Sequence, residues 1–179
     1  MNTIGATYLD SAIKRFLTYK TLGDMTFAQL EEKDFFFQPS EESNSIAVIV
    51  QHLHGNMLSR WTNFLTTDGE KEGRNRDEEF SPPTCTAKEL IALWETGWRC
   101  LIDTLRSLRE EDLLKTITIR HEPLIVIDAI NRQLAHYPHH VGQIVYLGKM
   151  IRDQHWRSLS ISKGASQTFN QDMEQRFKH

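Results

Sequence analysis

The segment NSIAVIVQHLHGNMLSRWTNFL, residues 44–65, decides the fold class of this chain. Its apolar side chains recur at intervals of three and four residues, which places them on one face of a helix. They are Ile46, Ile49, Val50, Leu53, Met57, Trp61 and Phe64. Ser43 stands just before the segment and is expected to cap the helix. The segment is therefore predicted to be an amphipathic helix with one buried face.

Three further segments, residues 3–32, 86–108 and 123–152, have the same helical period. Thr86 and Glu89 have the spacing of a capping box at the start of the third predicted helix. Three of the five prolines and three of the nine glycines fall outside these segments, where they interrupt the period. Four amphipathic helices without a convincing second strand predict an all-α protein, a four-helix bundle.

The links between the predicted helices differ in character. Residues 66–85 are polar and charged, contain two glycines and two of the five prolines, and must form a long loop. Loops of that length are often lids or binding loops. Within the link 109–122, residues 116–120 alternate enough to allow a short strand. The tail, residues 156–179, has no clear period and is expected to be irregular.

Length and composition narrow the class of protein. A chain of 179 residues suits one domain, here residues 1–179. The net charge of -3 gives no basic surface for nucleic acid. Cys85 and Cys100 are too few for a disulfide framework. Neither a signal peptide nor an apolar run of roughly 20 residues is present, so a cytoplasmic protein without a membrane partner is expected.

The eight histidines are the most informative residues. His136 and His140 are four residues apart, and at about 100° per residue they share one face of the fourth predicted helix. Two imidazoles so placed can bind one cation, with a third ligand from another helix. His52 lies near the apolar face of the second helix, whereas His54 is rotated from it by about 200°. His139 is likewise turned away from His140.

Spacing alone does not separate a metal site from histidines that are merely half-buried and hydrogen-bonded. Further candidates lie close to the histidines in sequence. Gln143, one turn from His140, could orient a ligand ring or a water. Asn56 and Arg60 continue the face of His52 and could reach a substrate anion, although Arg60 could instead pair with a loop carboxylate. Arg74 and Arg76 on the loop could clamp a carboxylate.

A resemblance to a known family favours a metal site over histidines that are merely half-buried. HYPHHVGQI, residues 136–144, resembles the H-x-x-x-H-x-G-Q signature of the DinB/YfiT-like superfamily. SIAVIVQHL, residues 45–53, resembles the second-helix motif of the same superfamily, in which a histidine follows an apolar run. NSIAVIVQHLHGNMLSRW, FLTTDGE, RNRDEEF and WRSLSISKG resemble a little-characterised bacterial subfamily within it. The likeness covers nearly the whole chain.

The resemblance implies a four-helix bundle with up-down-down-up topology. It also implies a divalent metal, most often zinc or nickel, held by His52, His136 and His140. Three neutral imidazoles leave at least one coordination position open. One departure from the family pattern is Pro138, which stands between two of these histidines and is expected to kink the helix at a cost of roughly 3 kcal/mol.

Several relatives in the superfamily are transferases that use a low-molecular-weight thiol such as bacillithiol, and relatives are often homodimers. The resemblance therefore implies a metal-dependent thiol transferase acting on a small molecule, with catalytic residues that the sequence does not identify. One alternative is a metal-dependent hydrolase, which the lack of a glutamate base beside the histidines disfavours. Another is a non-catalytic metal-binding or stress-associated protein.

Overall fold

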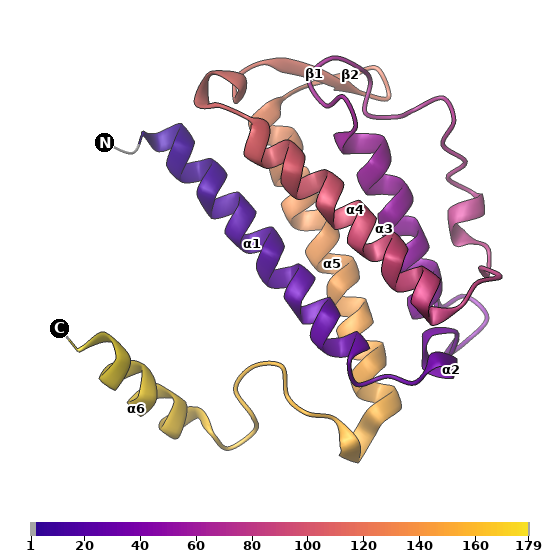
Figure 1. Cartoon of the computed structure of the whole chain (residues 1–179), viewed down its shortest axis with the longest axis vertical. Helices are drawn as coiled ribbons and strands as arrows, with labels where there is room; N and C mark the ends of the chain where they lie inside the picture. Colours follow the sequence, from indigo (N-terminus) through magenta and orange to yellow (C-terminus); the bar gives the residue numbers. More distant parts are fainter. Residues whose placement is uncertain (1–2, 179) are drawn as a thin grey trace.

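The computed structural model describes residues 3–178. In that range it is mostly helical, with six α-helices and one small antiparallel sheet (Figure 1). The α-helices are α1 (Ile4–Phe27), α2 (Glu32–Phe35), α3 (Ile46–Trp61), α4 (Ala87–Ser107), α5 (Val126–Arg152) and α6 (Ser166–Phe177). The strands are β1 (Thr116–Ile119) and β2 (Glu122–Ile125), and the short 3-10 helices are η1 (Glu78–Phe80), η2 (Glu110–Asp112) and η3 (Asp153–His155).

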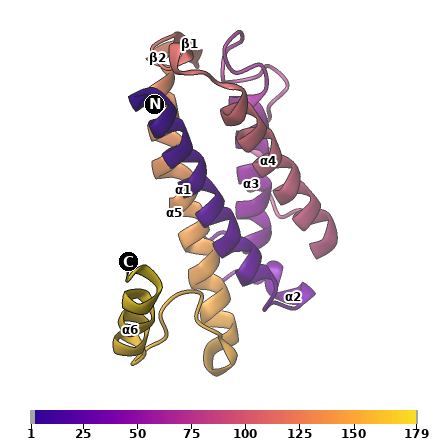
Figure 2. The same ribbon diagram turned by 60° about the vertical axis from the view of Figure 1, so that its left-hand side comes forward.

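The four long helices α1, α3, α4 and α5 lie side by side (Figures 1 and 2). α3 packs mainly against α4, and α1 packs mainly against α5, with further contacts between α1 and α4 and between α3 and α5. In Figure 1, α1 and α5 run from the end of the molecule that carries the hairpin to the opposite end, and α3 and α4 run back. Because α3 contacts α5, side chains of these two helices can meet between them.

Each long helix contributes at least one fully buried aromatic side chain to the core: Phe16, Trp61, Trp94, Trp98 and Tyr137. The ring of Trp98 lies 6.4 Å from that of Phe16 and 6.0 Å from that of Tyr137, in edge-to-face arrangements that aromatic pairs prefer. Trp61, which the sequence analysis placed on the buried face of residues 44–65, is buried as predicted, and Trp94 and Trp98 of α4 are buried as well.

A buried hydrogen-bond chain joins α3 to α5 beside the histidines. The indole Nε1 of Trp61 donates to the Tyr137 hydroxyl (2.9 Å), which donates in turn to Oδ1 of Asn56 (3.0 Å). All three side chains are buried, so each polar atom depends on these partners. Burial raises the pKa of Tyr137 well above its usual range, so the hydroxyl keeps its proton and remains a donor.

The ends of the first two predicted helices were partly wrong. α1 ends at Phe27 rather than at residue 32, because a separate short helix, α2, follows it with its own capping box between Glu31 and Asp34. α3 ends at Trp61 rather than at residue 65, since Asn63 turns the chain with a positive φ of 51°. The cap of α3 is Ser45, whose side chain accepts from the amide of Val48, and not Ser43.

The short strand predicted at residues 116–120 is confirmed as β1, but its partner was missed. β2 occupies residues that were assigned to the start of the fourth helix, which therefore begins at Val126 and not at residue 123. Pro123 pairs with Thr118 in this two-stranded ladder. A proline lacks an amide hydrogen but is tolerated in an edge strand, and both strands of this sheet are edges.

The remaining predictions concern the long loop and the tail. Residues 66–85 form an irregular connection apart from η1, as expected. The tail is irregular only as far as residue 165, because α6 follows it. α6 buries none of its side chains and stands apart from the four long helices (Figure 2). Its large apolar residues, Phe169, Met173 and Phe177, have a four-residue spacing, which the sequence analysis did not use. His179, the last residue of the predicted tail, lies outside the described residues.

None of the helices in the described part of the chain combines the length and the apolar character that a membrane crossing requires.

Candidate metal centre

His52 on α3 and the pair His136 and His140 on α5 meet where the two helices are neighbours. One ring nitrogen of each histidine lies within 4.8 Å of those of the other two, so the group could hold a metal ion. Nε2 of His136 is 3.4 Å from Nε2 of His52 and 3.1 Å from Nε2 of His140. His52 is buried and the other two rings are half-buried. The structure thus brings together the three residues that the sequence analysis selected.

The second nitrogen of each ring contacts an oxygen. Nδ1 of His52 lies 2.9 Å from Oε2 of Glu79, Nδ1 of His136 lies 3.2 Å from Oε1 of Gln133, and Nδ1 of His140 lies 2.9 Å from Oε1 of Gln143. Carboxylate and amide oxygens accept hydrogen bonds, so each Nδ1 carries the ring proton as donor. Each Nε2 then presents a lone pair towards the other two. This donor set fits a divalent cation, for which neutral imidazoles oriented by outer hydrogen bonds are common ligands.

Glu79 is held in place by a buried ion pair. Arg74 donates from Nε to Oε1 (2.7 Å) and from Nη2 to Oε2 (2.8 Å) of its carboxylate. Burial raises the pKa of Glu79, but the hydrogen bonds from Arg74 and His52 outweigh this effect and hold the pKa below its ordinary value. Gly55 on α3 makes room for the carboxylate, because a side chain there would collide with it. Glu79 is therefore a charged acceptor that orients the His52 ring.

Burial also shifts the pKa values of the two histidines on α5. It lowers the pKa of His136 to about 3, with the neighbouring His140 and His52 rings adding to the effect. It lowers the pKa of His140 to about 4 in the same way. Both rings are therefore neutral at pH 7, which is the protonation state that a metal ligand requires.

Metal-free protein is expected to lose stability as the pH falls from 7 to 5. Histidines of the unfolded chain take up protons near pH 6.5. In the folded chain, His140 stays neutral down to about pH 4 and His136 down to about pH 3. The unfolded state binds more protons across this window, so the free energy of unfolding decreases as the pH falls. Urea unfolding at pH 7, 6 and 5 in the presence of a chelator measures the slope.

The control for this prediction is a double variant, His136→Gln with His140→Gln, which keeps polar side chains but removes both titrating rings. Its free energy of unfolding should change less with pH than that of the wild type. Equal slopes in the two proteins would show that other groups cause the pH dependence.

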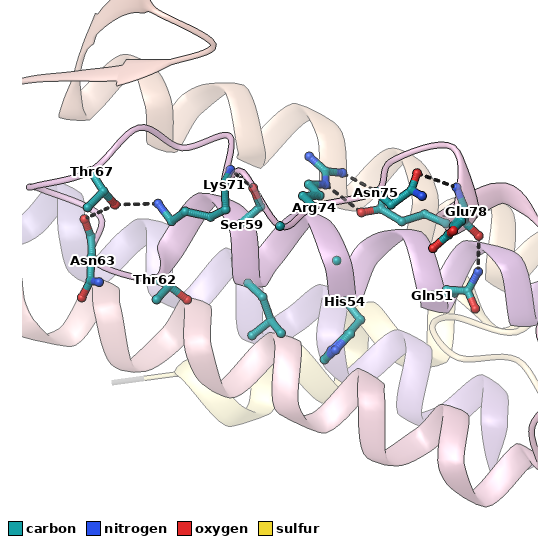
Figure 3. Close-up of a pocket in the computed structure, with 14 residues that line it drawn as sticks. Gln51, His54, Ser59, Thr62, Asn63, Thr67, Lys71, Arg74, Asn75 and Glu78 are labelled. Carbon is teal, nitrogen blue, oxygen red and sulfur yellow. Dashed lines mark hydrogen bonds and ion pairs between the residues drawn. The ribbon is translucent and has the colours of Figure 1, made fainter.

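The other two histidines near the motifs are turned away from the cluster. Nδ1 of His54 lies 2.9 Å from the carbonyl oxygen of Leu93 on α4. His54 lines a separate groove of about 670 Å³ between α3 and the long loop (Figure 3). His139 is exposed. This groove therefore lies on a different face of α3 from the one that carries His52.

Gln143 orients the His140 ring, which is one of the two roles that the sequence analysis considered for it. Gln133 was missed, although it stands three residues before His136 just as Gln143 stands three after His140. That spacing is a local signal, because residues three apart are neighbours on a helix. Glu79 was also missed, and no local pattern links this loop residue to His52.

Asn56 and Arg60 line the cavity at the histidines, but both are engaged with the protein. Asn56 accepts from Tyr137, and the buried guanidinium of Arg60 donates to the Gly69 carbonyl and to Glu70. The pairing of Arg60 with a loop carboxylate was the alternative left open by the sequence. Arg74 is likewise paired with the protein's own Glu79.

A cavity of about 310 Å³ opens above the cluster. Its lining combines the three histidines with five arginines, and the other residues are polar or aromatic. The arginines are Arg60, Arg74, Arg76, Arg120 and Arg132, and the remaining residues are Asn56, Phe80 and Gln133. The Phe80 ring lies over the His52 ring, with 4.7 Å between centroids. The cluster therefore faces a small and basic cavity.

Pro138 lies inside α5, which is assigned as one continuous helix from Val126 to Arg152. The rings of His136 and His140 on either side of it are 4.7 Å apart. The proline therefore does not separate the two histidines. The expected kink stays a prediction.

The family described as "Protein of unknown function (DUF1572)" matches residues 3–165. The match extends from the start of α1 to the residue before α6, so it includes every residue of the histidine cluster and its hydrogen-bond partners. No curated protein matches the chain.

Proposed function

The chain belongs to the DUF1572 family, and we propose that it is a DinB-like metalloenzyme that binds a divalent cation through His52, His136 and His140. The observation that carries the proposal is the convergence of three Nε2 lone pairs while every Nδ1 contacts an oxygen acceptor. Zinc and nickel are the proposed metals, because imidazole nitrogen suits both.

The fold class proposed with it is a four-helix bundle of up-down-down-up topology. The directions of the four long helices support this topology, since α1 and α5 run one way and α3 and α4 the other (Figure 1). Placing ligands on facing helices is how bundles build metal sites.

We further propose that the reaction is the transfer of a low-molecular-weight thiol to a small electrophile. The thiol loses its proton, its sulfur bonds to the electrophilic carbon, and the leaving group departs from that carbon with the electron pair of the broken bond. A divalent cation with an open position supplies Lewis-acid chemistry, which lowers the pKa of a thiol or water held there. The chain's own residues do the rest: Glu79, Gln133 and Gln143 orient the imidazoles, and the cavity holds the reactants close together. The arginine side chains favour a negatively charged sulfur over the neutral thiol.

A hydrolase is the second candidate, and the state of Glu79 disfavours it. Hydrolysis at such a site needs a free general base near the reacting water. Glu79 is the carboxylate that contacts the cluster, but it is paired with Arg74 and its pKa is lowered, so it is a weak proton acceptor. It also does not line the cavity above the cluster.

Metal analysis and a paired activity assay test the proposal. Protein purified without chelators is expected to contain close to one divalent metal per chain by elemental mass spectrometry. Zinc- or nickel-loaded protein is expected to consume a thiol such as bacillithiol or cysteine in the presence of an alkylating probe faster than it cleaves an ester. Thiol turnover that survives complete removal of the metal would overturn the proposed mechanism, and faster ester cleavage would favour the hydrolase.

A further inference from the structure

The arginines around the cavity carry more positive charge than their partners neutralise. Five arginines line it, and three carboxylates pair with them, so two positive charges remain in excess. One of these carboxylates, Glu70, is shared among Arg60 (2.9 Å), Arg74 (3.2 Å) and Arg120 (3.1 Å).

Four of the five arginines divide into two groups by burial, and the exposed Arg76 lies over the Phe80 ring at 5.0 Å. The side chains of Arg60 and Arg74 are 6% and 4% exposed and fasten the long loop to α3. Those of Arg120 and Arg132 are 52% and 47% exposed and stand at the mouth of the cavity. Among the described residues, Arg132 forms an ion pair only with Glu122, at 3.4 Å, and that carboxylate is itself 63% exposed. Exposed ion pairs contribute little to stability, so these two guanidinium groups remain free to bind another anion.

The backbone conformation of Arg120 is a separate observation that points the same way. Arg120 and His121 form the two-residue turn between β1 and β2, with φ values of 55° and 64°. Such turns usually take Asn-Gly, because residues other than glycine lose roughly 1 kcal/mol or more in the left-handed region. The carboxylate of Asp68 accepts from both amides of the turn, at 2.8 and 2.9 Å, and stabilises it. The turn thus contains an arginine at a position where glycine would be easier to accommodate.

Arg132 is placed by the same helix that places the histidines. It precedes His136 by four residues, and His136 precedes His140 by four, so the three side chains follow one face of α5. All three line the same cavity. The guanidinium of Arg132 therefore lies beyond the histidine cluster, on the side of the cavity mouth. Arg120, on the β1–β2 turn, lines the same cavity.

The geometry points to an anion subsite in which Arg120 and Arg132 hold a carboxylate or phosphate group of the small-molecule substrate at the cavity mouth, while its reacting end faces the histidines. This inference rests on the proposed function and names its substrate class: a small organic acid or phosphate ester. Guanidinium groups suit both anions, because their planar donors match two oxygens at once. The volume of about 310 Å³ restricts the occupant to a small molecule.

Calorimetric titration of the full chain tests the subsite, with zinc-loaded and with metal-free protein at constant ionic strength. The probes are inorganic phosphate and acetate, with acetamide as the neutral match for acetate. Wild type is expected to bind at least one anion and to prefer acetate over acetamide. Combining Arg120→Gln with Arg132→Gln should weaken anion binding by about tenfold or more, since two charge-assisted contacts are lost. The tighter of the two anions identifies the substrate group.

Two further variants separate binding from stability. Arg99→Gln removes an exposed arginine of α4 outside the cavity and should leave anion binding unchanged. Arg120→Gly should weaken anion binding without lowering the melting temperature, because glycine relieves the turn. Loss of stability with unchanged anion affinity would reduce Arg120 to a structural residue and overturn the proposal. Equal anion affinity in wild type and the double variant would overturn it too.

Zinc content is measured on every sample, which distinguishes the two proposals. Wild type without zinc but with arginine-dependent anion binding would refute the metal function and keep the subsite. Wild type that holds zinc and shows no arginine-dependent anion binding would refute the anion subsite and leave the metal function in place.

Discussion

Replacing His136 with alanine is expected to remove bound metal from the protein. His136 lies between the other two histidines, with its Nε2 at 3.4 Å from that of His52 and at 3.1 Å from that of His140. Its loss leaves two imidazoles, and the affinity should fall by more than about 100-fold, because losing only an outer hydrogen-bond partner already costs 10–100-fold. Elemental analysis after dialysis and a competitive chelator titration measure the change.

His139→Ala is the matched control, since His139 is an exposed histidine on the same helix. It should keep the metal content of the wild type. Added zinc should raise the melting temperature of the wild type and of this control, but not that of His136→Ala, because a ligand stabilises only the protein that binds it. Stoichiometric metal in His136→Ala would contradict the assignment of the cluster.

Replacing Glu79 with glutamine is expected to weaken metal binding by about 10–100-fold while leaving all three histidines in place. The carboxylate polarises the His52 ring through Nδ1 and is balanced by Arg74. The neutral amide is a weaker acceptor, so Nε2 of His52 becomes less basic. It also leaves the buried guanidinium of Arg74 with only Glu70 as a charged partner, so the melting temperature should fall as well.

Glu78→Gln is the control, because Glu78 is the exposed neighbour of Glu79 in η1. It removes one negative charge from the same loop and should change neither metal affinity nor stability appreciably. Gly55→Ala gives an independent test, since its methyl group would displace the Glu79 carboxylate. A wild-type metal affinity in both Glu79→Gln and Gly55→Ala would show that the carboxylate does not support the site.

Much of the helical framework could be predicted from the sequence, because helix formation leaves a local trace. The three- and four-residue spacing in residues 44–65 corresponds to α3, with errors of a few residues at its ends. The errors arose where the end depends on one residue's backbone, as at Asn63, or on pairing with a neighbouring strand, as at Pro123. α6 was missed because only three residues, Phe169, Met173 and Phe177, carry an apolar period in an otherwise polar tail.

The candidate site was predictable to the extent that its geometry is local to one helix. His136 and His140 share a face of α5 through helical rotation alone, and Gln133 and Gln143 follow from the same rule. His52 comes from another helix, and its selection depended on its facing together with the family resemblance. The sequence analysis found no glutamate base beside the histidines. The structure places Glu79 against His52, but it is paired with Arg74 and is not a free base.

By itself, then, the sequence determined the long amphipathic helices, the shared face of the two histidines on α5 and the choice of His52 over His54. Only the tertiary structure decided what surrounds them. Glu79 reaches His52 because the long loop is fastened by distant contacts, among them the Gly69 amide with the Thr118 carbonyl and Ser59 with the Gly69 carbonyl. Arg120 reaches the cavity mouth through a turn held by Asp68. Helical periodicity acts over one turn, whereas loop conformation depends on partners dozens of residues away.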